Sequence, residues 1–215
     1  MGHASYHHGD LRNSLVSIGT ELLNSKGVAG ISLREIARTI GVGHNAPYRH
    51  FKNKQELLEA IAEAGFRKLT ARNTRLELEY AHDPETQLFE SGMHVVIMSA
   101  EQPNLFQLMF GVYLQPGQSG SSLKQAADDA LQSLVGIIRN GQQKQVFIQK
   151  DPVKLALSAM SMIQGLAMMV SSGKLRPQVQ GGCEQHYSWS EHPVLLRGMV
   201  LQLFDVFLLG IKLEA

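Results

Sequence analysis

Long hydrogen-bond donors crowd one short stretch of this chain. Five of them fall within seven residues, and Phe51 is the only clearly apolar side chain among them. They are Tyr48, Arg49, His50, Lys52 and Lys54. Side chains of these types donate to the phosphate oxygens of a nucleic-acid backbone. The stretch therefore favours a nucleic-acid contact, provided that the elements around it expose it on one side.

The residues before the donors predict a short amphipathic helix. Its apolar positions repeat with the spacing of one helix face, at Leu33, Ile36, Ala37 and Ile40. Ser32 precedes them as an N-cap, and Glu35, three residues later, completes a capping box. We therefore expect a helix that begins after Ser32 and runs to the glycines that follow Ile40.

A turn and a second helix are expected next. Gly41-Val42-Gly43 predicts a tight turn, because glycine accepts a positive φ. The second helix spans His44 to Phe51 at most, with Pro47 in its first turn, where N–H groups have no intrahelical partner. Two short helices across such a turn describe a helix-turn-helix, whose second helix enters the major groove of DNA. The same pattern fits any pair of packed helices, so the donors decide in favour of DNA.

The run IAxxxGVxxxxxYxHFxxKxxL resembles the signature of transcriptional regulators of the tetracycline-repressor type, the TetR/AcrR family. Its fixed positions are Ile36, Ala37, Gly41, Val42, Tyr48, His50, Phe51, Lys54 and Leu57. The resemblance covers roughly the first third of the chain, and the APYRHF variant is similar to one branch of the family. Two positions depart from the pattern: Gly43 stands where the family often has a Ser cap, and Pro47 where it often has Leu.

The resemblance implies an all-α chain in two parts and a set of DNA contacts. Residues 1–72 would form a three-helix DNA-binding head, and residues 73–215 a helical body for effector binding and dimerisation. The implied DNA contacts are Ser32, Gly43, His44, Asn45, Tyr48, His50, Asn53 and Lys54. His44 and Asn45 would reach base edges, since Asn suits adenine. The others would hold phosphates or support the helix starts.

Beyond the head, the pattern predicts helices and no strand. Asn53 can cap a helix that runs to about Tyr80, about 40 Å long and so able to bridge head and body. Further helices are expected over residues 84–100, 103–110, 123–138, 153–171 and 193–211. Residues 115–122 are expected to form a loop. Residues 172–190 are rich in glycine and predict an irregular segment, whose order the sequence does not decide.

Composition and charge fit a soluble protein with a basic head. The chain has 215 residues, 44% hydrophobic and 18% charged, with one cysteine and hence no internal disulfide framework. Residues 1–72 carry ten Lys/Arg against six Asp/Glu, while the remainder carries ten against thirteen. Gln164, Gln202 and Asp205 interrupt the longest apolar runs, so we expect no membrane span and a cytoplasmic protein.

No enzyme motif is present. The sequence lacks GxSxG, a P-loop, a dinucleotide-binding glycine fingerprint and HExxH. Cys183, His186 and His192 are the one cluster of metal-ligand types, and their spacing matches no standard zinc pattern. We therefore expect no enzyme activity, cofactor or metal. The alternative is a helical ligand-binding protein or enzyme whose head no longer binds DNA.

The body is rich in Met and aromatic residues, which fill irregular space and suit varied apolar ligands. The resemblance implies an effector cavity there, and its expected lining is Phe106, Met109, Tyr113 and Met168. The last two helices carry small and apolar residues that allow close helix approach, and the expected dimer contacts are Ala159, Gly165, Gly198, Leu201 and Leu208. The full expectation is a homodimeric repressor that a small apolar effector releases from a palindromic operator.

Overall fold

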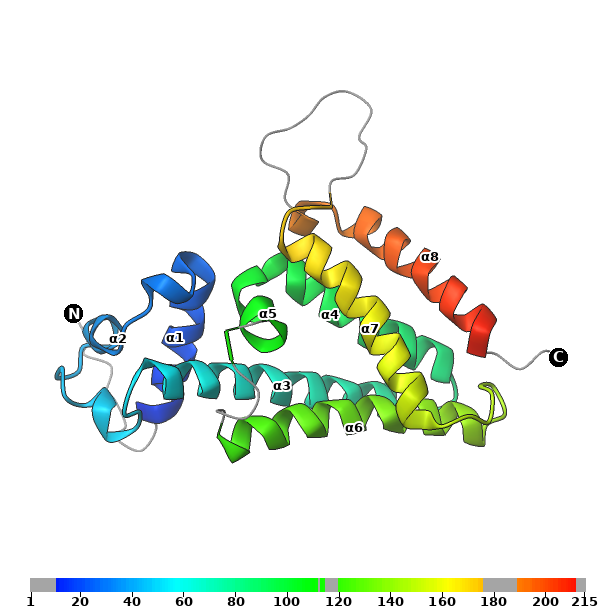
Figure 1. Cartoon of the computed structure of the whole chain (residues 1–215), viewed down its shortest axis with the longest axis horizontal. Helices are drawn as coiled ribbons and strands as arrows, with labels where there is room; N and C mark the ends of the chain where they lie inside the picture. The colour runs from blue at the N-terminus through cyan, green and yellow to red at the C-terminus, as the bar shows by residue number, and fades with distance from the viewer. Residues whose placement is uncertain (1–10, 112, 115–119, 176–188, 212–215) are drawn as a thin grey trace, which may run out of the picture.

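The chain forms two groups of helices that one long helix connects. The computed structural model describes residues 11–111, 113–114, 120–175 and 189–211, and within these ranges it contains α-helices and short 3-10 helices but no β-strand. Figure 1 shows α1 and α2 at one end, the remaining helices at the other, and α3 running between them. The expected all-α fold, with a helix-turn-helix head and a helical body, is confirmed.

The head consists of short elements packed on the first half of α3. These are α1 (Leu11–Lys26), η2 (Val28–Gly30), α2 (Leu33–Ile40) and η3 (Pro47–Arg49). Leu15 and Ile36 turn inward and are fully buried. Gly19 lets α1 approach α3 closely, because a Cβ at this position would lie 2.9 Å from Cδ1 of Ile61. These buried residues belong to the apolar core that continues into the body, and they fix which side of the head is exposed.

The helix α3 (Lys54–Glu79) connects the head to the body without a break at residues 72 and 73. Asn53 is its N-cap, as the sequence predicts, and its 26 residues correspond to a length of about 39 Å. Leu57, Ile61 and Leu76 are buried along α3, and Ile61 packs against Gly19 of α1. The helix α3 therefore contributes to one apolar core that extends from the head into the body.

The body consists of the later helices, packed along the second half of α3. These are α4 (Pro84–Glu101), α5 (Pro103–Phe110), α6 (Ser121–Gln143), α7 (Pro152–Ser171), η4 (Trp189–Glu191) and α8 (Pro193–Ile211). Asp83 and Asp151 cap α4 and α7 ahead of a proline in the first turn. α6 lies beside α3 along its length, and α8 lies at the outside against α4 and α7 (Figure 1).

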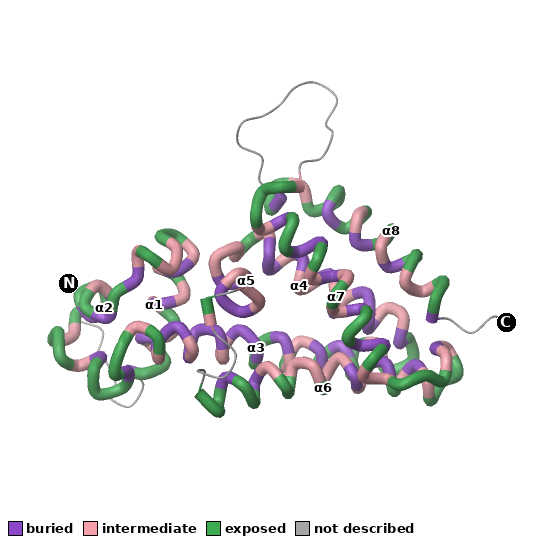
Figure 2. Tube along the Cα trace, viewed as in Figure 1, coloured by how far each residue is buried: buried purple, intermediate pink, exposed green. Residues whose placement is uncertain are grey.

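The helix α8 is the least covered of the body helices. Apolar Val206 and Leu209 are 68% and 86% exposed, and Figure 2 shows exposed positions along the outer side of α8. By length and composition alone, α7 and α8 could each cross a bilayer, so the expectation that interrupting polar residues make them too short was wrong. In the fold, α7 packs its apolar side onto other helices of the body.

Candidate nucleic-acid interface and body cavity

The first helix of the helix-turn-helix follows the sequence expectation closely. Ser32 accepts a hydrogen bond from the N–H of Glu35 at 3.1 Å, and the helix ends at Gly41, whose φ is 78°. The carboxylate of Glu35 pairs with Lys26 instead of closing the capping box. That hydrogen bond to Lys26 lowers the pKa of Glu35, against a smaller opposing effect of burial. The pair ties the end of α1 to α2.

The segment after the turn is not the α-helix that the sequence predicts. Residues 44–46 form a turn, and only Pro47–Arg49 are helical, as a 3-10 helix. Pro47 has no N–H to donate, and its ring would clash with the carbonyl four residues earlier, that of Gly43. The chain therefore forms hydrogen bonds that span three residues instead of four. An example is the bond from the N–H of His50 to the carbonyl of Pro47, at 2.9 Å.

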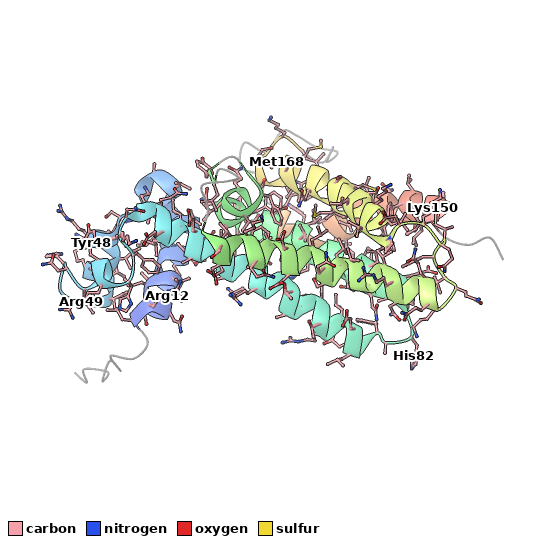
Figure 3. All side chains as sticks on the ribbon, turned by 60° about the horizontal axis from the view of Figure 1, so that its bottom comes forward. Arg12, Tyr48, Arg49, His82, Lys150 and Met168 are labelled. Carbon is pink, nitrogen blue, oxygen red and sulfur yellow. The ribbon has the colours of Figure 1, made fainter. Side chains whose placement is uncertain are left out.

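The tight turn nevertheless exposes the predicted contact residues on one short segment. Pro47 and Phe51 are buried and anchor the segment to the head. Exposed between and before them are His44, Asn45, Tyr48, Arg49 and His50. Figure 3 shows Tyr48 and Arg49 at the end of the head that faces away from the body. The structure thus brings His44, Asn45, Tyr48 and His50 together at the tip of the molecule.

Three arginines near this tip lie outside the set that the sequence predicts. The guanidinium of Arg12 lies 5.4 Å from the ring centroid of Phe51, which places a cation of α1 behind the segment. Arg34 and Arg38 are exposed on α2. Their spacing of four residues puts them on one helix face, and this periodic signal could have identified them.

The contacts at the start of α3 show which basic side chains near the exposed segment are free to bind phosphates. Asn53 accepts from the N–H of Glu56 at 3.0 Å, and the carboxylate of Glu56 accepts from the N–H of Lys52 at 2.8 Å. This is a closed capping box, so the Asn53 side chain is occupied. The ammonium of Lys52 lies 3.8 Å from Glu56. Arg49 and Lys54 form no ion pair with any described residue, which leaves their charges available for phosphates.

The body holds a partly open cavity of about 90 Å³ between α3, α4, α5, α6, α7 and α8. It is lined by Phe66, Leu69, Asn73, Leu88, Ser91, Gly92, Val95, Phe110, Ala127, Ala130, Leu131, Leu134, Ala159, Met160, Met162, Ile163, Gln164, Phe204 and Phe207. None of these lining residues is charged. The surface of the cavity is predominantly apolar, with a few amide and hydroxyl groups.

The four residues expected to line an effector site are not among those lining this cavity. Phe106 is fully buried behind Phe110, with 5.1 Å between ring centroids. Met109 packs on Gly65 of α3, where a Cβ would collide with its Sδ. Tyr113 is 50% exposed, and Met168 is exposed on α7. The sequence located the cavity in the body but gave no signal for which helix faces turn inward.

The residues expected at a dimer contact fall into two groups. Ala159 is buried and lines the cavity, and Leu208 is half-buried against the core. Gly165, Gly198 and Leu201 are exposed. The exposed apolar residues of α8 that the sequence did not single out are Val194, Leu195, Val206 and Leu209.

The candidate metal cluster falls largely outside the described residues, which exclude Cys183 and His186. Within the part of the chain that the structure describes, no three His, Cys, Asp or Glu side chains are grouped to hold a metal ion.

The helix-turn-helix matches a known sequence family. Residues 15–61 match the family described as "Bacterial regulatory proteins, tetR family". The chain is 45% identical over 53 residues to the tetracycline repressor protein class C of Escherichia coli, which is 25% of this chain and 24% of that repressor. It is 30% identical over 87 residues to the HTH-type transcriptional regulator AcrR of Shigella flexneri, 40% of either chain. Residues 15–61 are a DNA-binding region of the TetR/AcrR family.

Solved structures match over nearly the whole length. A protein of unknown function from Rhodococcus sp. RHA1 has a TM-score of 0.78 at 29% identity, covering 98% of this chain and all of that one. A putative TetR-family transcriptional regulator from Mesorhizobium loti MAFF303099 has a TM-score of 0.72 at 15% identity, covering 97% of this chain and all of that one. The second likeness concerns the fold alone. The aligned stretches span about a quarter of the tetracycline repressor and 40% of AcrR, so the likeness in sequence covers less than half of either regulator.

Proposed function

We propose that this TetR/AcrR-family regulator is a cytoplasmic homodimeric repressor, which a small apolar effector releases from a palindromic operator. One observation carries the proposal. The helix α3 starts at Lys54, beside the exposed donors, and presents Phe66, Leu69 and Asn73 to the cavity. Lys54 and Asn73 are 19 positions apart, which is about 28 Å along the helix. A ligand that moves the cavity wall therefore acts on the element that positions the head.

The same helix joins a DNA-binding part of the chain to a part that binds the effector and the second subunit. Residues 1–72 bind the operator: His44 and Asn45 at base edges, and Tyr48, His50 and Lys54 at phosphates. Arg34, Arg38 and Arg49 add to the phosphate contacts, because they are exposed on the same head and form no ion pair with a described residue. Residues 73–215 hold the effector and the second subunit.

The second subunit covers α8. Exposed apolar residues occur along the length of this helix. Gly198 offers a position where a partner helix can approach closely, since no atom lies within 4 Å of a Cβ placed there. A two-fold axis beside α8 makes the contact self-complementary and places two heads on one palindrome.

The test is an electrophoretic mobility shift assay with the full-length protein. The probes are fragments from upstream of its own coding region and shuffled fragments of equal length and composition, each at two salt concentrations. The proposal predicts a preference for one upstream fragment that persists at the higher salt, while binding to shuffled DNA weakens steeply. Equal affinity for all fragments would show non-specific DNA binding and would contradict the proposal of an operator.

A further inference from the structure

The lining of the body cavity restricts the chemistry of its ligand. No Asp, Glu, Lys, Arg or His is among the described residues that line it. A charged group placed there would lose its hydration without gaining a partner of opposite charge, and burial of an unpaired charge is strongly unfavourable. The cavity therefore selects against carboxylates and ammonium groups.

Asn73 offers a hydrogen-bond acceptor to this cavity. The residue is 6% exposed, and its Nδ2 donates to the hydroxyl of Ser133 at 2.8 Å. The Ser133 proton is already used, because that hydroxyl donates to the carbonyl of Ala130 at 2.7 Å. This chain of bonds fixes the amide with Nδ2 toward Ser133. Oδ1 of Asn73 accepts no hydrogen bond from a described residue and is left for a ligand donor.

Ser91 supplies a second polar group. It is 7% exposed and lines the cavity from α4, and its hydroxyl has no hydrogen-bond partner in the part of the chain that the structure describes. Ser99, two turns later on the same helix, is also buried, but its hydroxyl donates to the carbonyl of Val96 at 2.7 Å. Buried polar groups in native proteins nearly always find a partner. Ser91 is satisfied when a bound molecule supplies one.

We propose that the effector is an uncharged, mainly hydrocarbon alcohol or phenol, whose hydroxyl donates to Oδ1 of Asn73 or accepts from Ser91. A hydroxyl both donates and accepts, so it complements both groups, whereas the phenyl and aliphatic walls complement its hydrocarbon part. This inference rests on the proposed function, because it names the chemical class of the effector.

The test compares probes of equal length by isothermal titration calorimetry on the full-length protein without DNA. The probes are 1-octanol, heptyl methyl ether, octanoate and octylammonium. We expect 1-octanol to bind best. The ether, which cannot donate, should bind about two- to tenfold more weakly, the range set by the net free energy of one hydrogen bond. Octanoate and octylammonium should bind at least about a hundredfold more weakly.

Variants separate the polar contacts from packing. Asn73→Leu keeps the size of the side chain and leaves Ser133 bonded to Ala130, so it should abolish the preference for 1-octanol over the ether. Ser91→Ala should weaken the binding of 1-octanol and of the ether alike, because both oxygens can accept from its hydroxyl. Ser99→Ala, the same change on the same helix away from the cavity, should weaken neither. If Asn73→Leu fails to fold, the pair Ser91→Ala and Ser99→Ala still decides.

Three results would overturn the inference: no binding of 1-octanol, octanoate binding as tightly as 1-octanol, or cavity variants that bind 1-octanol and the ether with the same affinities as the unchanged protein. The proposed function fails separately. If 1-octanol binds with the expected preference but leaves operator affinity unchanged, the ligand class stands and release by an effector does not. If octanoate binds and releases DNA, the repressor stands and the ligand class falls.

Discussion

The side-chain amide of Asn104 donates a hydrogen bond to the main-chain oxygen of Asn24, 3.1 Å away, and so ties the start of α5 to α1 of the head. Asn24 in turn donates from Nδ2 to Oε1 of Gln102 at 3.4 Å. Its own Oδ1 is buried without a partner among the described residues. The other end of α5 carries Phe110, which borders the cavity and packs edge-on against Phe66 of α3 at 5.3 Å. A second route therefore joins cavity and head, alongside α3.

Asn104→Ala removes the direct bond between α5 and the head. We expect the free energy of unfolding to fall by about 1 kcal/mol, the usual contribution of one partly buried hydrogen bond. Coupling between ligand and DNA should weaken as well, because α5 then holds the head less firmly. Urea denaturation and DNA titrations of the variant check both effects. Gln107→Ala on the same helix is the control, and equal behaviour of the two variants would contradict a special role for the joint.

Lys54→Ala should weaken binding to operator and random DNA by the same factor. The proposed function assigns its ammonium to a phosphate, and phosphates carry no sequence information. The slope of log affinity against log salt should become shallower by about one unit. Titrations at several salt concentrations measure this slope. A change in base preference with an unchanged slope would show that Lys54 contacts bases.

Asn45→Ala should have the opposite effect. Asn45 is exposed in the turn before η3 and is placed at a base edge, so its loss should relax specificity at one base pair by about 1–3 kcal/mol. The salt slope should stay the same. Binding to a set of operators, each with a single base-pair change, identifies the position. A uniform loss across the whole set would place Asn45 at the backbone instead.

Leu201→Asp should convert the protein to a monomer. Leu201 is 42% exposed on α8, and an unpaired charge buried against a second subunit costs several kcal/mol. Light scattering measures the change in mass, and operator binding should fall because the two half-site contacts are no longer linked. Leu78→Asp, at an 80% exposed leucine on α3, is the matched control and should leave the mass unchanged. A Leu201→Asp variant that stays dimeric would move the interface off this part of α8.

His94 predicts a pH dependence of stability. Burial lowers its pKa from the ordinary value of 6.5, and nearby Arg72 lowers it further, while Glu101 acts in the opposite direction. The unfolded chain therefore binds a proton more readily, and the free energy of unfolding falls as pH drops below about 6.5. His94→Gln should lose this part of the pH dependence. Denaturation at pH 7.5 and 5.5 measures it, and identical pH dependence in both proteins would count against the assignment.

The sequence predicted the helices well wherever local chemistry marks their ends. Ser32, Asn53, Asp83 and Asp151 are caps, and each begins the expected helix. The prediction failed around Pro47, because its missing N–H and its ring disfavour an α-helical turn that begins at the carbonyl of Gly43. Residues 172–190 cannot be compared over 176–188, which lie outside the described residues.

The residues that line the cavity could not be predicted from the sequence, although the resemblance implied a cavity in the body. Whether Met109 or Phe110 faces the cavity depends on how α5 rotates against α3, and Gly65 favours Phe110 because it lets Met109 pack directly on α3. The apolar pattern of α5 is the same in either rotation. Polar Asn73 and Ser91 gave no periodic signal, since their role depends on contacts between helices that are distant in the sequence.

Titration of a cavity ligand with and without operator DNA tests the central claim, that the cavity and the DNA-binding head are coupled. The ligand is 1-octanol, and the protein is either free or saturated with its operator fragment. The account predicts weaker ligand binding to the DNA complex, with a coupling of about 1–3 kcal/mol, and an equal loss of DNA affinity when the cavity is filled. Equal ligand affinity in the two states would contradict it, and the body would then serve only to join the subunits.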